Sequence, residues 1–428
     1  MLIKSYFIQI WTQLRHHQVI SAVSIAGTAL AIFLIMLVVM MQQVRVAPFA
    51  PESNRKRFLH VKFISVTNGS WSGNAPMSIK IADECFKSLR TPEAVTAYTF
   101  KVESTPIGLP KQPAVNIDLL QTDDVFWRVF DFSFVAGKPY DEAMFNSGLP
   151  VAIVTESTAK TLFHTTDVVG RELLLNHVPY KVVGVVKDVS TLATTAYGQV
   201  WIPYTSTEIT KDIWGEEIMG WMSCTILARD ADDFDVIREE VERRRQEYNK
   251  HMLADGSELV YRGRPYDQEK NSMAFSASKE PDIGQVRRQR LIVFVILLLV
   301  PAINLSSMTQ SRLRQRVSEI GVRRAFGSTR LELMGQIIAE NFWVTLIAGI
   351  LGLLLSVAFA YLGNSLLFAL EFSPTSVPPM VDAGILLHAS TFFYALLFCF
   401  ILNLLSSGLP AWRASRVGIV NALNGRLH

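Results

Sequence analysis

Six arginines within one short segment, residues 310–341, give this chain its clearest capacity for specific binding chemistry. They are Arg312, Arg314, Arg316, Arg323, Arg324 and Arg330. Two acids, Glu319 and Glu332, lie among them or directly after them. Guanidinium groups form charge-assisted hydrogen bonds with carboxylates, so a cluster of them suits an acidic partner surface. The segment also separates two long apolar runs, and such positive charge is typical of a cytoplasmic loop in a membrane protein.

The segment is expected to fold as two helices joined by a sharp turn. Apolar residues recur at helical spacing before Gly327, a residue type that ends helices. These apolar residues are Leu313, Val317 and Ile320. Thr329 and Glu332 are spaced as a capping box, which predicts the start of a second helix. That helix continues into the apolar run that begins at Phe342, so a push on the first helix would reach the membrane through the second.

The alternative interpretation is a solvated basic loop that only orients the membrane spans. A family resemblance favours the first interpretation. The run EIGVRRAFGSTR, from Glu319 to Arg330, is followed ten residues on by Glu340, and it resembles the signature of the FtsX and MacB family of ABC-transporter permeases. In that family the matching loop is a coupling helix that sits in a groove on a separate or fused ATPase.

The resemblance implies which residues contact the ATPase. They are the residues at the matching positions, Glu319, Ile320, Gly321, Arg323, Arg324 and Gly327. The end of the chain, PAWRASR at residues 410–416 followed by Ala422 and Leu423, also resembles the closing motif of the family. Ile419 stands where the family usually has proline, which leaves the shape of the tail open.

The composition is that of a protein with several membrane spans. Half of the residues are hydrophobic, 18% are charged, and the mean hydropathy is +0.25. Residues 1–18 form an amphipathic, basic sequence that predicts a cytoplasmic helix lying in the membrane interface. Residues 19–41 are long enough for a first membrane span and too long for the apolar core of a signal peptide, so we expect this span to be retained.

Residues 44–290 have the composition of a soluble domain and are expected to lie outside the cytoplasm. Two strand–helix–strand units, at residues 58–102 and 221–262, bracket other material, which predicts a split βαβ subdomain. In the first unit a strand is expected at residues 58–66 and a helix at residues 79–89. The material between them includes an insertion at about residues 116–210 with mixed, β-rich character, in which the aromatic residues at positions 126–132 are expected in a core. This succession resembles the MacB-like periplasmic core domain.

Three further spans are predicted, at residues 291–308, 342–362 and 385–409, followed by a cytoplasmic tail at residues 410–428. The fold class is therefore an α-helical membrane protein with four transmembrane helices plus a large extracytoplasmic α+β domain. Within the third span, small residues recur every four positions and predict close helix packing, either within this chain or with a second copy. They include Ala348, Gly352, Ser356 and Ala360.

The sequence predicts no catalytic residue, metal ion or cofactor. The eight histidines are scattered, and the three cysteines show neither CxxC nor metal-ligand spacing. The pair Gly137-Lys138 lacks the glycine spacing and the following Ser or Thr of a phosphate loop, and no Walker motif is present. We therefore expect a permease subunit that is not an enzyme and depends on a separate ATPase. A disulfide between Cys85 and Cys224 and two unpaired thiols both remain open.

The function that the resemblance implies is a permease subunit in the inner membrane, with both termini cytoplasmic. It would pass ATP-driven movement to the outer domain for export of a drug, peptide or toxin. The expected partners are an ABC ATPase, a second copy or a related permease, a periplasmic adaptor with an outer-membrane channel, and membrane lipids, but no nucleic acid. A lipoprotein-releasing permease of the Lol type and an FtsX-like regulator of a cell-wall hydrolase are the alternatives.

Overall fold

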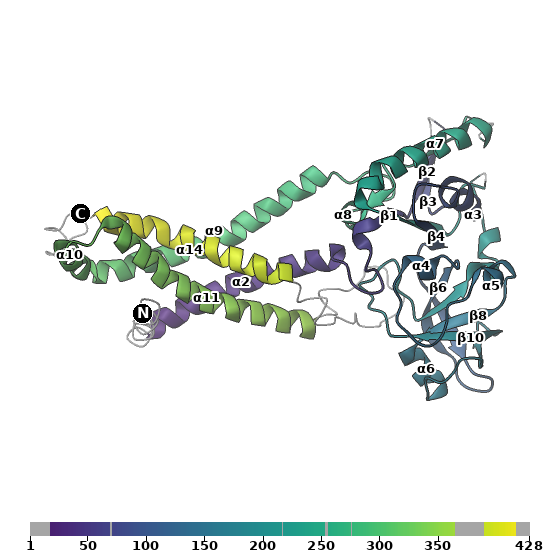
Figure 1. Cartoon of the computed structure of the whole chain (residues 1–428), viewed down its shortest axis with the longest axis horizontal. Coiled ribbons are helices and arrows are strands. Elements are labelled where there is room, and N and C mark those ends of the chain that lie inside the picture. Colours follow the sequence, from purple (N-terminus) through teal and green to yellow (C-terminus); the bar gives the residue numbers. More distant parts are fainter. Residues whose placement is uncertain are drawn as a thin grey trace. The chain divides into compact units, whose positions relative to one another are not determined.

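The computed structural model describes residues 18–68, 71–215, 217–252, 256–274, 276–363 and 389–416 (Figure 1). These residues form two compact units. One unit holds residues 44–283, and the other holds the helices within residues 18–43, 284–363 and 389–416. The predicted interfacial helix lies outside the described residues except for its last position, and so do Ile419 and the end of the predicted tail.

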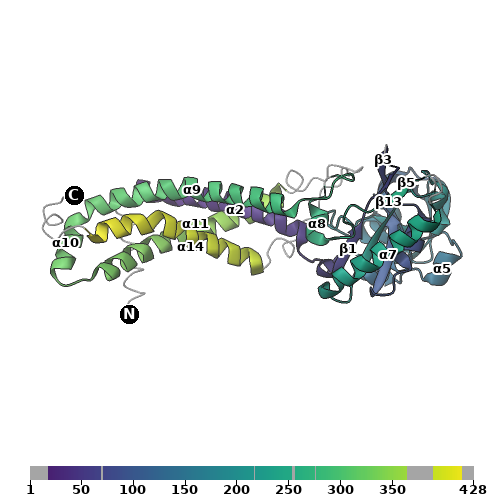
Figure 2. The ribbon, with the colours of Figure 1, turned by 90° about the horizontal axis from the view of Figure 1, so that it is seen from above.

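Five helices account for the described part of the helical unit (Figure 2). They are α2 (Gln18–Val46), α9 (Ile283–Gln315), α10 (Val317–Ala325), α11 (Arg330–Leu362) and α14 (Ala389–Arg416). Among the described residues, three helical stretches are long and apolar enough to cross a membrane: Ile25–Val46, Arg330–Leu362 and Phe393–Arg413. Predicted span 291–308 lies inside α9, and the described part of span 385–409 lies inside α14.

The helices extend beyond the predicted spans. Helix α9 begins eight residues before position 291, and α11 begins at Arg330 instead of Phe342. The reason is that hydropathy locates the apolar part of a helix, whereas caps and turns determine where the helix ends. The apolar part of α11 is therefore continuous with the second helix of the basic segment. Helices α11 and α14 pack against each other along the unit.

Four strands of the other unit form an antiparallel array in the order β4–β12–β1–β14. Their bounds are β1 (Phe58–Val61), β4 (Ala94–Thr99), β12 (Met222–Leu227) and β14 (Tyr266–Asp267). Strand β1 from the first predicted βαβ unit lies directly beside β12 from the second, with Phe58 opposite Leu227. Short helices α3 (Ile79–Ile81) and η2 (Ala82–Lys87) follow β1, and α7 (Phe234–Met252) follows β12. Buried residues of η2 and α7 share one hydrophobic core with these strands.

Two predicted elements differ from the structure. The strand expected at residues 58–66 is divided at Lys62 and Phe63, and its second half, β2 (Ile64–Thr67), joins a separate sheet with β3 (Ser72–Ala75) and β13 (Glu258–Val260). The helix expected at residues 79–89 is one α-helical turn followed by the π-helical turn η2. The continuous apolar pattern through residues 58–66 is explained by burial of both strands, not by one unbroken strand.

The inserted material forms a closed ring of six strands. Neighbours in the ring follow the order β6–β11–β8–β10–β9–β5, and β5 pairs with β6 to complete it. The strands are β5 (Glu103–Gly108), β6 (Val115–Thr122), β8 (Val151–Thr155), β9 (Glu172–Leu175), β10 (Val178–Val186) and β11 (Val200–Pro203), and β7 (Phe134–Gly137) pairs outside the ring with β10. The ring therefore begins at β5, before predicted position 116, because β5 pairs with β6 and β9.

Short helices cover and connect these strands. They are η1 (Arg55–Arg57), α4 (Phe126–Val129), α5 (Glu142–Asn146), α6 (Glu156–Phe163), η3 (Tyr204–Ser206), η4 (Ile209–Lys211), η5 (Ala231–Asp233) and α8 (Gln268–Ser272). The aromatic residues expected in a core at positions 126–132 are central to this packing. Phe126 and Phe130 are fully buried in a cluster that also holds Phe58 of β1 and Trp201 of β11. This cluster joins the four-stranded array to the ring.

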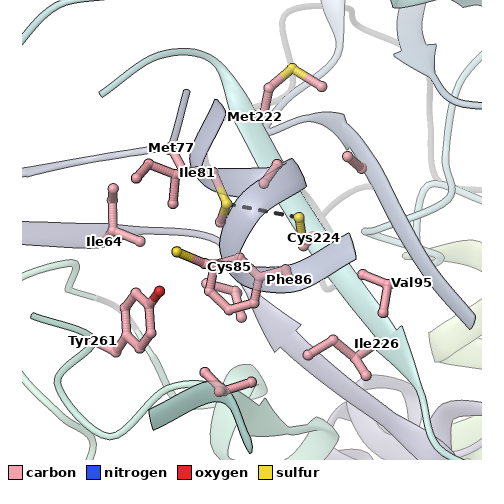
Figure 3. Close-up of a cluster of buried hydrophobic side chains, with 14 of the residues drawn as sticks. Ile64, Met77, Ile81, Cys85, Phe86, Val95, Met222, Cys224, Ile226 and Tyr261 are labelled. Carbon is pink, nitrogen blue, oxygen red and sulfur yellow. Dashed lines mark hydrogen bonds between the residues drawn. The ribbon is translucent and has the colours of Figure 1, made fainter. Parts of the chain in front are cut away.

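Cys85 and Cys224 are free thiols buried in the core of the four-stranded array (Figure 3). The Cys224 Sγ lies 3.8 Å from the Met77 Sδ. Burial raises the pKa of the Cys85 thiol to about 11 and raises that of Cys224 well above its ordinary value. Both cysteines are thus unpaired core residues in the structure. Of the two possibilities that the sequence leaves open, the structure shows two unpaired thiols and not a disulfide.

Residues 44–283, produced without the helical unit, are expected to form a soluble domain. The expectation follows from the compactness of this unit and from its own hydrophobic cores. Thermal unfolding followed by circular dichroism should show one cooperative transition. A gradual, non-cooperative loss of signal would contradict the expectation.

The stability of that domain is expected to fall between pH 7 and pH 5 because of His60. The side chain is buried, which is the main reason that its pKa is lowered to about 4, and its Nε2 lies 2.8 Å from the Gln268 Oε1. Between pH 6.5 and pH 4 the unfolded chain therefore binds a proton that the folded chain does not. The expected loss is roughly 2 kcal/mol at pH 5.

Urea unfolding at pH 7, 6 and 5 measures this effect. The variant His60→Gln lacks the titrating group, so its stability should change less over the same range. A pH dependence that is identical in the wild-type domain and in His60→Gln would show that other groups cause it.

Candidate functional site

The basic segment forms a helical hairpin with its own small hydrophobic core. Leu313 at the end of α9, Ile320 of α10, and Leu333 and Ile337 of α11 are buried together with Ala411 of α14. Ala411 belongs to the segment that resembles the closing motif of the family. The two stretches that carry the resemblance therefore pack against each other in the structure.

The turn between α10 and α11 is fixed by backbone geometry at Gly327. This residue has φ +97°, a conformation that favours glycine. The amides of Gly327 and Ser328 donate to the carbonyls of Arg324 and Arg323, both at 3.1 Å, which is the pattern of a Schellman motif. The predicted capping box is present at the start of α11, with Thr329 N donating to Glu332 Oε2 at 2.9 Å.

Five polar side chains close a ring between α10, α11 and the residue that joins α9 to α10. Arg323 donates to Glu319 Oε1 and to Gln336 Oε1, both at 2.7 Å. Gln336 donates to Glu340 Oε1 at 3.0 Å, and Arg316 Nη1 donates to Glu340 Oε2 at 3.1 Å. The Arg316 Nε lies 3.4 Å from Glu319 Oε2, which completes the ring. The ring and the neighbouring apolar residues line a cavity of about 30 Å³.

This arrangement changes the role expected for some of the predicted residues. Glu319 and Arg323 are engaged with each other, and Arg323 also holds α11, while 44% and 36% of their side-chain surfaces stay exposed. Ile320 and Gly321 are buried within the hairpin. We expected the arginines and Glu319 to face a partner, whereas Arg323 and Glu319 also hold the hairpin together.

Three apolar residues that the sequence analysis did not single out are exposed around the turn. Phe326 is 88% exposed, Leu331 is 80% exposed and Val322 is 44% exposed. Arg330 is also exposed, and Arg324 is half-buried. An apolar residue directly beside the helix-ending Gly327, within a run of arginines, is the signal that would have revealed this surface. We refer to Val322, Phe326 and Leu331 as the apolar tip.

The small residues predicted on the third span are buried against helices of the same unit. Ala348, Gly352, Ser356 and Ala360 have little or no exposed surface. A methyl group placed on Gly352 would lie 2.6 Å from the Ala29 carbonyl oxygen of α2. Gly349, which the prediction omitted, faces Cys399 of α14 in the same way. This part of α11 thus permits close approach of α2 and α14.

Comparisons with known families agree with this architecture. The family described as the MacB-like periplasmic core domain matches residues 21–244, and the FtsX-like permease C-terminal family matches residues 291–419. The first match alone covers more than half of the 428 residues. The chain belongs to the FtsX/MacB-like family of ABC-transporter permeases, and it combines a large β-rich domain of the MacB-like type with membrane-type helices.

Individual relatives are distant. The macrolide export ATP-binding/permease protein MacB of Escherichia coli K12 is 24% identical over 302 residues, which cover 70% of this chain and 42% of MacB. YknZ, an ABC transporter permease of Bacillus subtilis, is 24% identical over 307 residues, which cover 70% of this chain and 68% of YknZ. The crystal structure of the periplasmic region of MacB from Actinobacillus actinomycetemcomitans aligns with 47% of this chain and 88% of its own, with 17% identity and a TM-score of 0.34. The chain thus spans less than half the length of the MacB relatives that it matches.

Substituting Gly352 by leucine is expected to reduce the amount of folded, membrane-inserted protein. The new side chain would collide with the backbone of Ala29 and with Ile32, and such overpacking costs about 1–3 kcal/mol. Gly335 lies in the same helix with nothing within 4 Å of its added methyl group, so Gly335→Leu is the matched control. Fluorescence size-exclusion chromatography after detergent extraction measures both variants. Equal monodisperse peaks for the two would show that α11 does not depend on this contact.

Proposed function

We propose that this chain is a permease subunit that passes ATP-driven movement across the inner membrane to its β-rich domain, and that it serves export of a drug, peptide or toxin. In this proposal the membrane is crossed by the three apolar stretches of α2, α11 and α14 and also by α9, which contains the predicted span at residues 291–308, and both termini are cytoplasmic. The β-rich domain, with its split βαβ subdomain and inserted ring, then lies outside. Membership of the FtsX/MacB-like family supports the proposal. Two copies, or this chain with a relative, would assemble with two ATPase subunits.

The exposed Phe326 is the observation that carries the proposed ATPase contact. Burying a phenylalanine side chain stabilises an assembly by about 1.5–3 kcal/mol, and this residue is 88% exposed. Lipid does not suit this position, because several arginines surround the turn and charged residues are costly within a bilayer. A protein groove with an apolar floor and an acidic rim matches the apolar tip and its flanking arginines.

The hairpin is built to transmit a force applied at the tip. Its core and polar ring fix α10 against α11, and α11 is one helix from Arg330 to Leu362. A displacement of α10 by the ATPase would therefore move the membrane part of α11. Of the predicted contact residues, we assign Arg324 and Gly327 to the contact surface, and Glu319, Ile320, Gly321 and Arg323 chiefly to holding its shape.

Replacing Phe326 by serine is expected to reduce co-purification of the ATPase subunit at least about tenfold, because loss of a hot-spot residue costs about 2 kcal/mol or more. The fold should be unaffected, since the side chain is almost fully exposed. Phe326→Leu retains an apolar side chain and is the matched control, which should stay close to wild type. The measurement is the amount of ATPase recovered with the tagged permease and its stimulated ATP hydrolysis.

Two outcomes discriminate between the roles of the hairpin residues. Unchanged ATPase recovery with Phe326→Ser would contradict the proposed contact. Arg323→Glu would break the polar ring, so its loss of ATPase should be accompanied by faster proteolysis within the hairpin. Such a change in proteolysis is not expected for Phe326→Ser.

A further inference from the structure

A buried ion pair ties the end of α2 to the β-rich domain. Arg55 is 1% exposed, and its guanidinium donates to the carbonyl oxygens of Val44 at 2.7 Å and Ala47 at 3.0 Å. The last carbonyls of a helix have no partner within that helix, and a cation satisfies them well. The same guanidinium donates to the Leu192 carbonyl oxygen at 2.8 Å. One side chain therefore links the end of α2 to the segment between β10 and β11.

Glu52 completes the link from the other side. It is fully buried and accepts from Arg55 Nε at 2.6 Å and from the amides of Thr195 at 2.8 Å and Ala196 at 3.0 Å. Burial alone would raise the pKa of this carboxyl, but Arg55 and the two amides bring it below its ordinary value. The charged pair is thus matched by hydrogen bonds on both sides, as a buried pair requires.

A neutral side chain ties the same helix end to the four-stranded array. Gln268 donates from Nε2 to the Arg45 carbonyl oxygen at 2.8 Å, and its Oε1 lies 2.8 Å from His60 of β1. The end of α2 is therefore anchored at two points, one toward the ring and one toward β1. Both anchors involve residues that are at least nine-tenths buried.

The segment that leads into α9 is held differently. Lys270 pairs with Glu280, and their side chains are 17% and 50% exposed. Arg264 also donates to the Ala277 carbonyl oxygen at 3.0 Å. Because partly exposed ion pairs contribute little to stability, the Lys270–Glu280 pair is expected to hold this segment only weakly.

We propose that Glu52 and Arg55 form a joint through which movement of α2 reaches residues 188–197 and hence the inserted ring. They are positioning residues, and the inference rests on the proposed function because the movement starts at the ATPase. Helix α2 is unbroken from Gln18 to Val46, so a displacement along it arrives at the carbonyls that Arg55 holds. Residues 188–197 lead directly into β11, which closes the ring with β6.

The test uses the full chain with its co-purified ATPase in lipid nanodiscs and follows amide hydrogen exchange with and without bound ATP. In the wild type, exchange within residues 188–197 should change by about fivefold or more between the two states, the lower end of typical allosteric coupling. The double variant Glu52→Gln/Arg55→Met removes the tie to α2 without leaving an unpaired buried charge. Its glutamine still accepts from Thr195 or Ala196, so the segment keeps a partner.

If Glu52 and Arg55 form this joint, the double variant should retain ATP hydrolysis and an ATP-dependent change in hydrogen exchange at the end of α2. It should lose the change in exchange within residues 188–197. Lys270→Met/Glu280→Gln is the matched control, and it should keep both changes. The inference is overturned if the double variant keeps the full ATP-dependent change in exchange within residues 188–197. It is also overturned if the control variant loses that change to the same extent. A wild-type complex that hydrolyses ATP without any change in residues 188–197 also overturns it. A wild-type chain that recruits no ATPase overturns the proposed function and the inference together.

Discussion

Backbone groups left unpaired at helix ends must find partners, and both the helical hairpin and the end of α2 depend on how they do so. At the end of α10 the Gly327 turn satisfies two carbonyls and exposes the apolar tip. At the start of α11 the Thr329 capping box lets the helix begin ahead of its apolar part. At the end of α2 the Arg55 guanidinium takes the same role with a side chain from the β-rich domain. Each of these contacts fixes a helix end to the residues that lie beside it.

Much of the fold follows from local sequence patterns, and the differences arise where pairing is non-local. The described parts of the four apolar runs lie within helices, and the two βαβ units indicated strands that the structure places side by side as β1 and β12. The break at Lys62 and Phe63 arises because β2 pairs with β13, and β5 belongs to the ring because it pairs with β9. The alternation of residue types along a strand does not specify its neighbour, so neither feature could be predicted. The helix ends also differ from the ends of the predicted spans, because caps and not hydropathy determine where a helix begins and ends.

The candidate site was predictable as a shape but not as a set of contacts. Gly327, Thr329 and Glu332 indicated the hairpin because turn and cap signals are local. The polar ring was not predictable, since Gln336 and Glu340 meet Arg323 and Arg316 only after α10 folds back on α11. A count of arginines also cannot identify those that hold the hairpin, such as Arg316 and Arg323. The exposed Phe326 shows that charge alone did not indicate which side chains lie at the surface of the turn.

The burial of the three cysteines has a practical consequence for spectroscopy on this protein. Cys85 and Cys224 lie in the core of the β-rich domain, Cys399 lies between helices, and each exposes 2% of its surface or less. Maleimide and nitroxide reagents require an accessible thiolate, and these thiols offer little access. Two cysteines placed on exposed positions would therefore carry a pair of probes while the native residues stay in place. Distances within either unit can then be followed in a chain whose packing has not been altered to remove its own sulfur atoms.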